Sequence, residues 1–249
     1  MGGLAHYLEG SGIPTTQISL VRPHTEKICP PRALWVSFDF GRPFGVPNDP
    51  GFQRRVLRRA LILLEAGSGP VLESYDEDAP GSGSDASGWA CPVDLRPRPQ
   101  PLDDPTGHLT ALLGEMRMLG KWYDLGREKR GRSTVGVSGL KPEQAARHIV
   151  SYLAGQPEEN PRPGTPPATL LKLACEDLRA FYTEAAVSQP GSPTPQEVSE
   201  WFWGQTQAGW LFLALPAVLA RIPDKATQMV GERMVVPYAQ RHRLKDKGI

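Results

Sequence analysis

The stretch from residue 79 to residue 106 constrains the fold most, because it separates two segments with different periodicities. It combines Gly, Ser, Pro and Asp with little apolar periodicity, a composition typical of a linker or an extended crossing segment. Short strand-like runs precede it, whereas helical patterns dominate after it. The sequence therefore predicts one domain at 1–80, a linker at 81–106 and a second domain at 107–249.

In the first segment, strand-like and helical patterns alternate. The expected elements are a helix at 3–10, strands at 15–21 and 33–40, and a helix at 52–66. Leu57, Leu61 and Leu64 are expected to form the buried face of the last helix. The second strand is continuously apolar, as strands of buried parallel sheets are. This alternation predicts a small α/β unit of parallel strands with flanking helices.

The second segment predicts a mainly α-helical domain. Apolar residues recur at helical spacing in 109–123, 142–153, 168–186 and 195–215. The last of these helices is apolar around most of its circumference, which places it at the centre of a bundle or at a subunit interface. Pro216 is expected to kink or end it.

Composition excludes several classes of function. The 28 Lys and Arg residues nearly balance the 27 Asp and Glu residues, without the basic excess of a nucleic-acid-binding protein. Neither the three cysteines nor the five histidines have metal-ligand spacing. No signal peptide is visible, and the most apolar stretch, 208–220, is too short to span a bilayer. We therefore expect a soluble cytoplasmic protein that holds no metal or cofactor and binds neither nucleic acid nor membranes.

The loop at 41–50, between the second strand and the following helix, is the strongest candidate binding site. Its backbone N–H groups, with Arg42, Gly45, Asn48 and Asp49, could hold a carboxylate or phosphate near the N-terminus of that helix. Alternatively, the loop is a tight turn in which Asn48 or Asp49 caps the helix. The two roles are compatible, and the sequence leaves both open.

A second glycine-rich loop, at 131–139, superficially suggests a phosphate cradle. It lacks the Gly-Lys-Ser/Thr of a P-loop and the G-x-G-x-x-G of a dinucleotide site. The sequence therefore favours a structural turn.

Cys91 and Cys29 are the candidate catalytic thiols. Cys91 lies in an apolar island at 89–93, which is expected to dock onto another part of the chain, and an exposed thiolate there would be a nucleophile. Cys29 lies in the connection between the two strands, near the expected carboxyl edge of the sheet, where α/β folds bind ligands. For both, a packed apolar side chain is the favoured alternative. Cys175 lies on a helical apolar stripe and is expected to be structural.

Five segments of the first domain carry a family resemblance. They are LEGSGIP at 8–14, RAL at 32–34, GRPFGVP at 41–47, the helix at 55–64 and GPVLE at 69–73. Together they resemble the C-terminal end of the selenoprotein B subunits of glycine, sarcosine, betaine and D-proline reductases. Residues 85–249 resemble bacterial sequences linked to that family, and no activity comes with that second resemblance.

The resemblance implies a diverged or accessory reductase component. Its reaction would be thiol-linked reductive cleavage of a small anionic or amine-bearing molecule, with Cys29 or Cys91 as the internal thiol and the loop at 41–50 as the anion site. In the family, a selenocysteine- or cysteine-containing redox motif lies upstream of the helix equivalent to residues 3–10, and this sequence does not contain it. Either the motif is encoded upstream of Met1, or a partner subunit carries it, or the lineage has lost the chemistry.

A non-catalytic interaction protein is the main alternative. The α/β unit would then pair with a partner that completes a larger sheet. The cluster of arginines in the 52–66 helix would hold an acidic partner or form an ordinary solvated face. A third alternative, an unrelated enzyme with its site in the helical domain, is supported by no particular residues.

Overall fold

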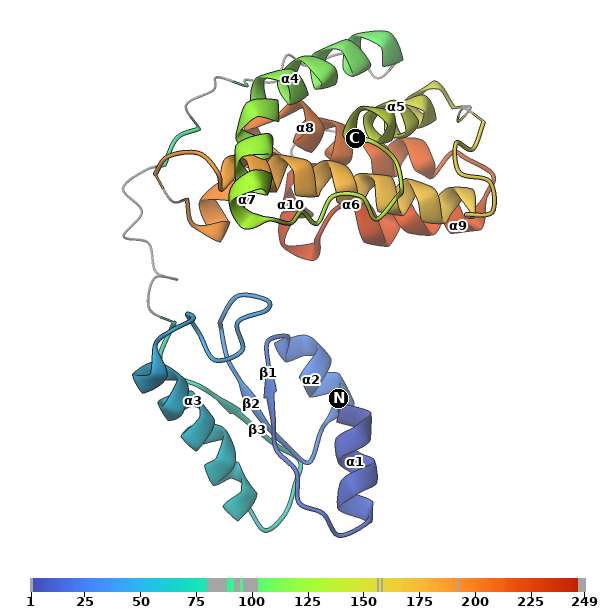
Figure 1. The fold of residues 1–249 in the computed structure, drawn as a ribbon. Coiled ribbons are helices and arrows are strands. Elements are labelled where there is room, and N and C mark those ends of the chain that lie inside the picture. The colour runs from blue at the N-terminus through green and yellow to red at the C-terminus, as the bar shows by residue number, and fades with distance from the viewer. Residues whose placement is uncertain are drawn as a thin grey trace. The chain divides into compact units, whose positions relative to one another are not determined.

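The computed structural model describes residues 2–79, 89–91, 95, 103–155, 157, 159–191 and 193–245. The chain divides into two compact units, Met1–Ser87 and Gly88–Ile249, and the division falls within the predicted linker. The first unit contains a small parallel sheet and the second is helical, which confirms the predicted fold class (Figure 1). Within these described ranges, no helix combines the length and the apolar character needed to cross a membrane.

The α/β unit is built around a parallel sheet with the strand order β1-β2-β3. Its elements are α1 (Gly2–Gly10), β1 (Gln17–Ser19), α2 (Arg22–Ile28), β2 (Arg32–Trp35), α3 (Pro50–Ile62), the 3-10 turn η1 (Leu63–Glu65) and β3 (Val71–Ser74). In the sheet, Gln17 pairs with Ala33, and Arg32 pairs with Val71. Figure 1 shows α3 on one side of the sheet and α1 and α2 on the other.

The core of this unit lies between α3 and the sheet. Three aromatic rings meet there: Phe52 of α3 lies 5.4 Å from Phe38 and 6.0 Å from Tyr75, measured between ring centroids. Leu34 and Val36, from β2 and the residues after it, are fully buried beside them. Burial of these rings is what attaches α3 to the sheet.

The buried face of α3 differs from the predicted one. The residues that α3 and η1 bury are Phe52, Val56, Ala60 and Leu63. The predicted face, Leu57, Leu61 and Leu64, points outward, with exposed fractions of 44%, 49% and 37%. Both sets have helical spacing, so periodicity alone does not distinguish them. The ring cluster decides, because only the set that includes Phe52 reaches it.

The sequence pattern does not predict α2 or β3, and it predicts too long a second strand. The helix α2 buries only Thr25, so it lacks the apolar stripe that would reveal it. The strand β3 has four residues and no buried one, too little for a clear alternation. The second strand ends at Trp35 rather than Phe40, because the chain leaves the sheet there for the loop at 41–50.

The helical unit consists of helices of very different lengths. They are α4 (Pro105–Arg130), α5 (Pro142–Ser151), η2 (Tyr152–Ala154), α6 (Pro167–Ala186), α7 (Pro195–Gln205), α8 (Gln207–Leu219), α9 (Lys225–Val230), the π-helical turn η3 (Gly231–Val235), η4 (Tyr238–Gln240) and α10 (His242–Lys245). The central helix is α6, which packs against α4, α5, α7 and α9. The helical pattern predicted for 168–186 is confirmed, and its apolar stripe, with Leu171, Ala174 and Leu178, is fully buried.

Thr206 divides the last predicted helix into α7 and α8. Its backbone is extended, and its hydroxyl accepts a hydrogen bond from Gly209 N at 2.9 Å as the N-cap of α8. A Cβ at Gly209 would lie 2.0 Å from the Phe202 carbonyl oxygen, so the close approach of the two helices requires glycine. Pro216 lies within α8, which continues to Leu219, so the proline does not end the helix.

Candidate functional site

The carboxyl edge of the parallel sheet carries the loop at 41–50. This loop follows β2, and the segments that follow β1 and β3 reach the same edge because the strands are parallel. Ser37 donates a hydrogen bond to the Asp78 carboxylate at 2.5 Å, and Arg22 donates one to Ser74 Oγ at 2.6 Å. The three segments are therefore joined at the edge where α/β folds bind ligands.

The predicted binding residues of this loop mainly cap α3. The Asp49 carboxylate accepts a hydrogen bond from Phe52 N at 2.9 Å, so it occupies the helix N-terminus that an anion would need. Asn48 and Gly45 have positive φ angles of 65° and 84°, and a Cβ at Gly45 would lie 2.6 Å from the Phe52 ring. The capping alternative is therefore confirmed for Asp49. Anion binding stays a prediction that rests on the exposed Arg42 and Asn48.

Cys29 lies at the opposite edge of the sheet from this loop, so its predicted place at the carboxyl edge is wrong. The chain returns along α2 to the amino edge before it reaches Cys29, which precedes β2. The side chain is exposed, and its Sγ donates a hydrogen bond to the Glu26 carbonyl oxygen at 2.9 Å. Cys29 and the loop at 41–50 therefore do not form one site.

Cys91 belongs to the other unit and helps to anchor the segment that precedes α4. It is half-buried and packs against the helical core. Next to it, Trp89 donates its backbone N–H to Glu197 at 2.9 Å and packs edge-on against Trp201, with ring centroids 6.1 Å apart. The predicted docking of the apolar island is confirmed for residues 89–91, while 92–93 lie outside the described residues.

The loop at 131–139 binds carboxylates of its own chain. Asp177, fully buried in α6, accepts hydrogen bonds from the backbone N–H groups of Gly136, Val137 and Ser138 at 2.7, 3.0 and 2.9 Å. The Ser138 hydroxyl donates to the same carboxylate. A phosphate would need these successive N–H groups, and they are already occupied. The prediction of a structural turn is therefore confirmed.

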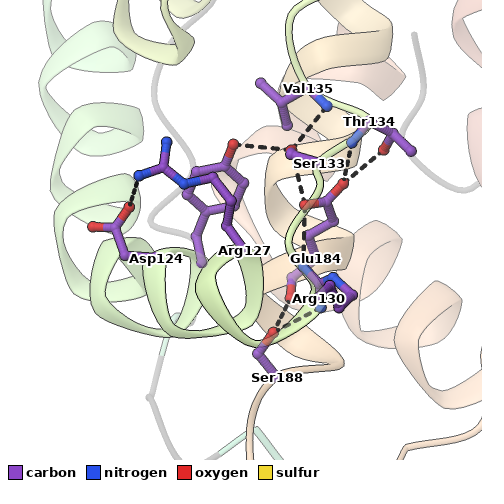
Figure 2. A network of polar contacts seen from close by, with 9 residues as sticks. Asp124, Arg127, Arg130, Ser133, Thr134, Val135, Glu184 and Ser188 are labelled. Carbon is purple, nitrogen blue, oxygen red and sulfur yellow. Dashed lines mark hydrogen bonds and ion pairs between the residues drawn. The ribbon is translucent and has the colours of Figure 1, made fainter.

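Glu184 lies two turns further along α6 and forms hydrogen bonds with residues at the start of the same loop (Figure 2). Its carboxylate accepts hydrogen bonds from Thr134 N at 2.6 Å, Ser133 Oγ at 2.9 Å and Arg130 Nη2 at 3.1 Å. Ser133 Oγ lies 3.0 Å from the Tyr123 hydroxyl, which connects the network to α4. Burial alone would raise the pKa of Glu184, but these hydrogen bonds and the Arg130 charge lower it below its usual range.

Glu115 is a third buried carboxylate, and it connects α4 to α6 and α8. It accepts hydrogen bonds from the Tyr182 hydroxyl at 2.7 Å and from Gln207 N at 2.8 Å. Burial raises the pKa of Glu115 to about 7, although these hydrogen bonds act to lower it. The side-chain amide nitrogen of Gln207 also lies 3.2 Å from His108 Nδ1. Glu115 therefore joins three helices.

The exposed face of α3 and η1 carries an apolar surface that we call the leucine stripe, formed by Leu57 and Leu61 of α3 and Leu64 of η1. A shallow pocket of about 270 Å³ adjoins it, lined by Leu57 together with Phe44 and Pro50. None of the three leucines belongs to the core of the α/β unit or is among the side chains that pack against it. It is therefore free to contact another molecule.

The arginines of α3 differ in their partners. Arg55 donates to Glu77 at 2.9 Å, and Arg59 forms an ion pair with Glu73. In the part of the chain that the structure describes, no carboxylate lies within ion-pair distance of Arg54. Arg54 also lines the shallow pocket, so an unpaired positive charge borders the leucine stripe.

Comparisons with protein-family models, with curated proteins and with solved structures found no match. Among the described residues, no group of three His, Cys, Asp or Glu side chains is arranged to hold a metal ion. Sequence reasoning missed the carboxylates Asp177, Glu184 and Glu115. The available signal was spacing: Asp177 and Glu184 are seven residues apart beside the buried stripe of α6, where a carboxylate requires hydrogen-bond donors.

Proposed function

We propose that this chain is an accessory component of a selenoprotein B-like reductase system and acts by docking onto a partner subunit. The proposal joins the resemblance of residues 1–80 to one structural observation, the leucine stripe on α3. The partner would carry the redox motif, and the complex would act on a small anionic or amine-bearing molecule without binding nucleic acid. Three free cysteines favour a reducing cytoplasm as the place of action.

The chemistry of α3 supports a partner with acidic and apolar groups. The three leucines would be buried in the contact, and the unpaired Arg54 beside them would favour a carboxylate on the partner. Arg55 and Arg59 are already neutralised by glutamates of the α/β unit, so they would add little. The expected occupant is therefore an amphipathic segment with acidic residues at its margin.

Binding to a selenoprotein B-type subunit that carries the redox motif tests the proposal. We expect Leu61→Asp to weaken the complex at least about tenfold, because it places a charge in the apolar contact. The matched control is Leu125→Asp in α4, since Leu125 is 51% exposed and Leu61 is 49% exposed. Calorimetry and sedimentation would measure both. Absence of binding by the unchanged chain, or equal binding by L61D and L125D, would contradict the docking role.

A second proposal keeps the thiol chemistry that the resemblance implies. The observation that favours it is the exposed thiol of Cys29. Cleavage of a C–N bond would yield C–H and N–H bonds while two thiols become a disulfide, so Cys29 would need a second thiol from the partner or from a small dithiol. Dithiothreitol-dependent amine release should then disappear in Cys29→Ser. Equal release by the unchanged chain, Cys29→Ser and Cys91→Ser would exclude this mechanism.

A further inference from the structure

Two adjoining hollows run along one face of α4 in the helical unit. Their volumes are about 580 Å³ and about 470 Å³, and Thr110 and Leu113 line both. On α4 the lining residues recur every three or four positions from Thr106 to Arg127, as residues on one helix face do. Each volume lies in the range of roughly 300–1,000 Å³ that is typical of ligand pockets. We call the two hollows together the α4 groove.

Gly120 leaves part of the α4 groove open. It lines the larger hollow, and a Cβ at this position would meet nothing within 4 Å. Glycine in a helix interior is less favourable than alanine, so Gly120 lowers the stability of α4 while it leaves this space open. A larger side chain at position 120 would extend into this space without a backbone clash.

The floor of the larger hollow is apolar and held in place. Met116 and Phe181 line it and are buried. The Tyr123 ring lies 4.8 Å from the Phe181 ring, and its hydroxyl is tied to Ser133 at 3.0 Å. Ser133 is part of the hydrogen-bond network in Figure 2, so the aromatic wall is fixed before any ligand arrives.

Positive groups border this apolar floor. Arg117 lines the larger hollow and Arg147 the smaller one, and within the described ranges neither has a carboxylate at ion-pair distance. Asp124 and Glu143 also line the larger hollow; Asp124 pairs with Arg127 at 3.5 Å, whereas among the described residues no carboxylate lies within ion-pair distance of Arg117. We propose that the α4 groove binds an amphipathic carboxylate, with its apolar chain on the floor and its carboxylate at Arg117.

Octanoate and octan-1-ol test this proposal, because they share a chain length and differ in charge. By calorimetry at low salt we expect octanoate to bind with a Kd of roughly 1 mM and the alcohol to bind at least about tenfold more weakly. Arg117→Gln should remove that difference and leave the alcohol unaffected. The proposal would be overturned if octanoate did not bind detectably at about ten times the expected Kd. It would also be overturned if R117Q still preferred octanoate to the alcohol by the same factor.

Two glycines of α4 supply a matched pair of blocking variants. Gly120→Leu should weaken octanoate binding at least about tenfold, because the new side chain extends into the larger hollow. Gly114→Leu is the control: a Cβ there also meets nothing within 4 Å, and Gly114 lines neither hollow. Both substitutions raise the helix propensity of α4 by the same amount, so the two variants should differ little in stability. Octanoate binding retained in G120L would show that the ligand lies elsewhere. The proposal does not depend on docking at α3.

Discussion

The two units of this chain differ in the size of the apolar core that they bury. The helical unit buries the large side chains of α6, α7 and α8, and its buried carboxylates accept hydrogen bonds from its own loops and helices. The α/β unit has a much smaller core and leaves the leucine stripe on its surface. Small units bury a smaller fraction of their surface and are correspondingly less stable. The comparison shows a helical unit with a large core and an α/β unit that leaves three leucines of one face exposed.

Asp177→Ala should have the largest effect, because it tests whether the helical unit depends on its internal carboxylates. Three backbone N–H groups and the Ser138 hydroxyl would lose their acceptor, and a buried group left without a partner costs about 1–3 kcal/mol. We expect the free energy of unfolding of the helical unit to fall by about 4 kcal/mol. Urea denaturation followed by tryptophan fluorescence would measure it, since all tryptophans except Trp35 lie in this unit.

The neighbouring Glu176 provides the control. Its carboxylate pairs with Lys172 at 2.9 Å, and both side chains are 38% exposed. Glu176→Ala should therefore cost less than about 1 kcal/mol. Equal effects of the two substitutions would mean that the loop at 131–139 does not need its buried acceptor.

Glu115 should make the stability of the helical unit fall as the pH rises. Its pKa in the folded state is about 7, above the value of 4.5 in the unfolded chain, because of burial. Between these two pKa values, the folded state binds the proton of Glu115 more tightly than the unfolded state does. The stabilisation from protonated Glu115 is therefore complete below about pH 4.5 and is lost as the pH rises through about 7. The expected loss is on the order of 3 kcal/mol.

Glu115→Gln isolates this contribution, because the amide keeps an acceptor for Tyr182 and Gln207 and does not titrate. The free energy of unfolding of E115Q minus that of the unchanged chain should therefore increase from pH 5 to pH 8. Glu184 has the opposite sign, since its pKa is lowered and its contribution is lost on acidification, but both proteins contain it and it cancels. A pH-independent difference would exclude Glu115 as the titrating group.

The two faces of α3 offer the next test, in adjacent residues. Val56 is fully buried against the sheet, and Val56→Ala should lower the stability of the α/β unit by about 2 kcal/mol. Leu57 is 44% exposed, and Leu57→Ala should change stability by less than about 0.5 kcal/mol. Amide hydrogen exchange in α3 would report on this unit alone. The reverse order would restore the face predicted from the sequence.

The sequence predicts helices well where one apolar stripe is present and poorly elsewhere. The stripe of α6 was sufficient to locate both the helix and its buried side, as Leu178 illustrates. In α3 two apolar stripes lie side by side, and only contacts with the sheet choose between Val56 and Leu57. Apolar residues lie on both sides of the polar run at 204–207, so periodicity alone joins α7 and α8, and the N-cap role of Thr206 is visible only in the backbone.

The candidate sites depend even more on tertiary structure. The loop at 41–50 was placed correctly after β2, because a strand followed by turn-forming residues is a local signal. Cys29 was assigned to the wrong edge, because the polar helix α2 that carries the chain back gives no periodic signal. The partners of Asp177 lie about 40 residues away in sequence, and no local pattern specifies them.

Cys29→Ser is expected to have the smallest effect on stability. This variant is useful because it identifies which thiol of the chain reacts fastest. Cys29 is exposed, Cys91 is half-buried, and burial raises the pKa of Cys175 to about 12. A disulfide reagent that reacts with thiolates should therefore modify Cys29 at least about tenfold faster than Cys91, and Cys175 only after unfolding. C29S should lose the fast phase and change stability by less than about 0.5 kcal/mol. Since Cys29 reports on the α/β unit and Cys175 on the helical core, fast reaction of Cys175 in the native chain would contradict a closed helical body.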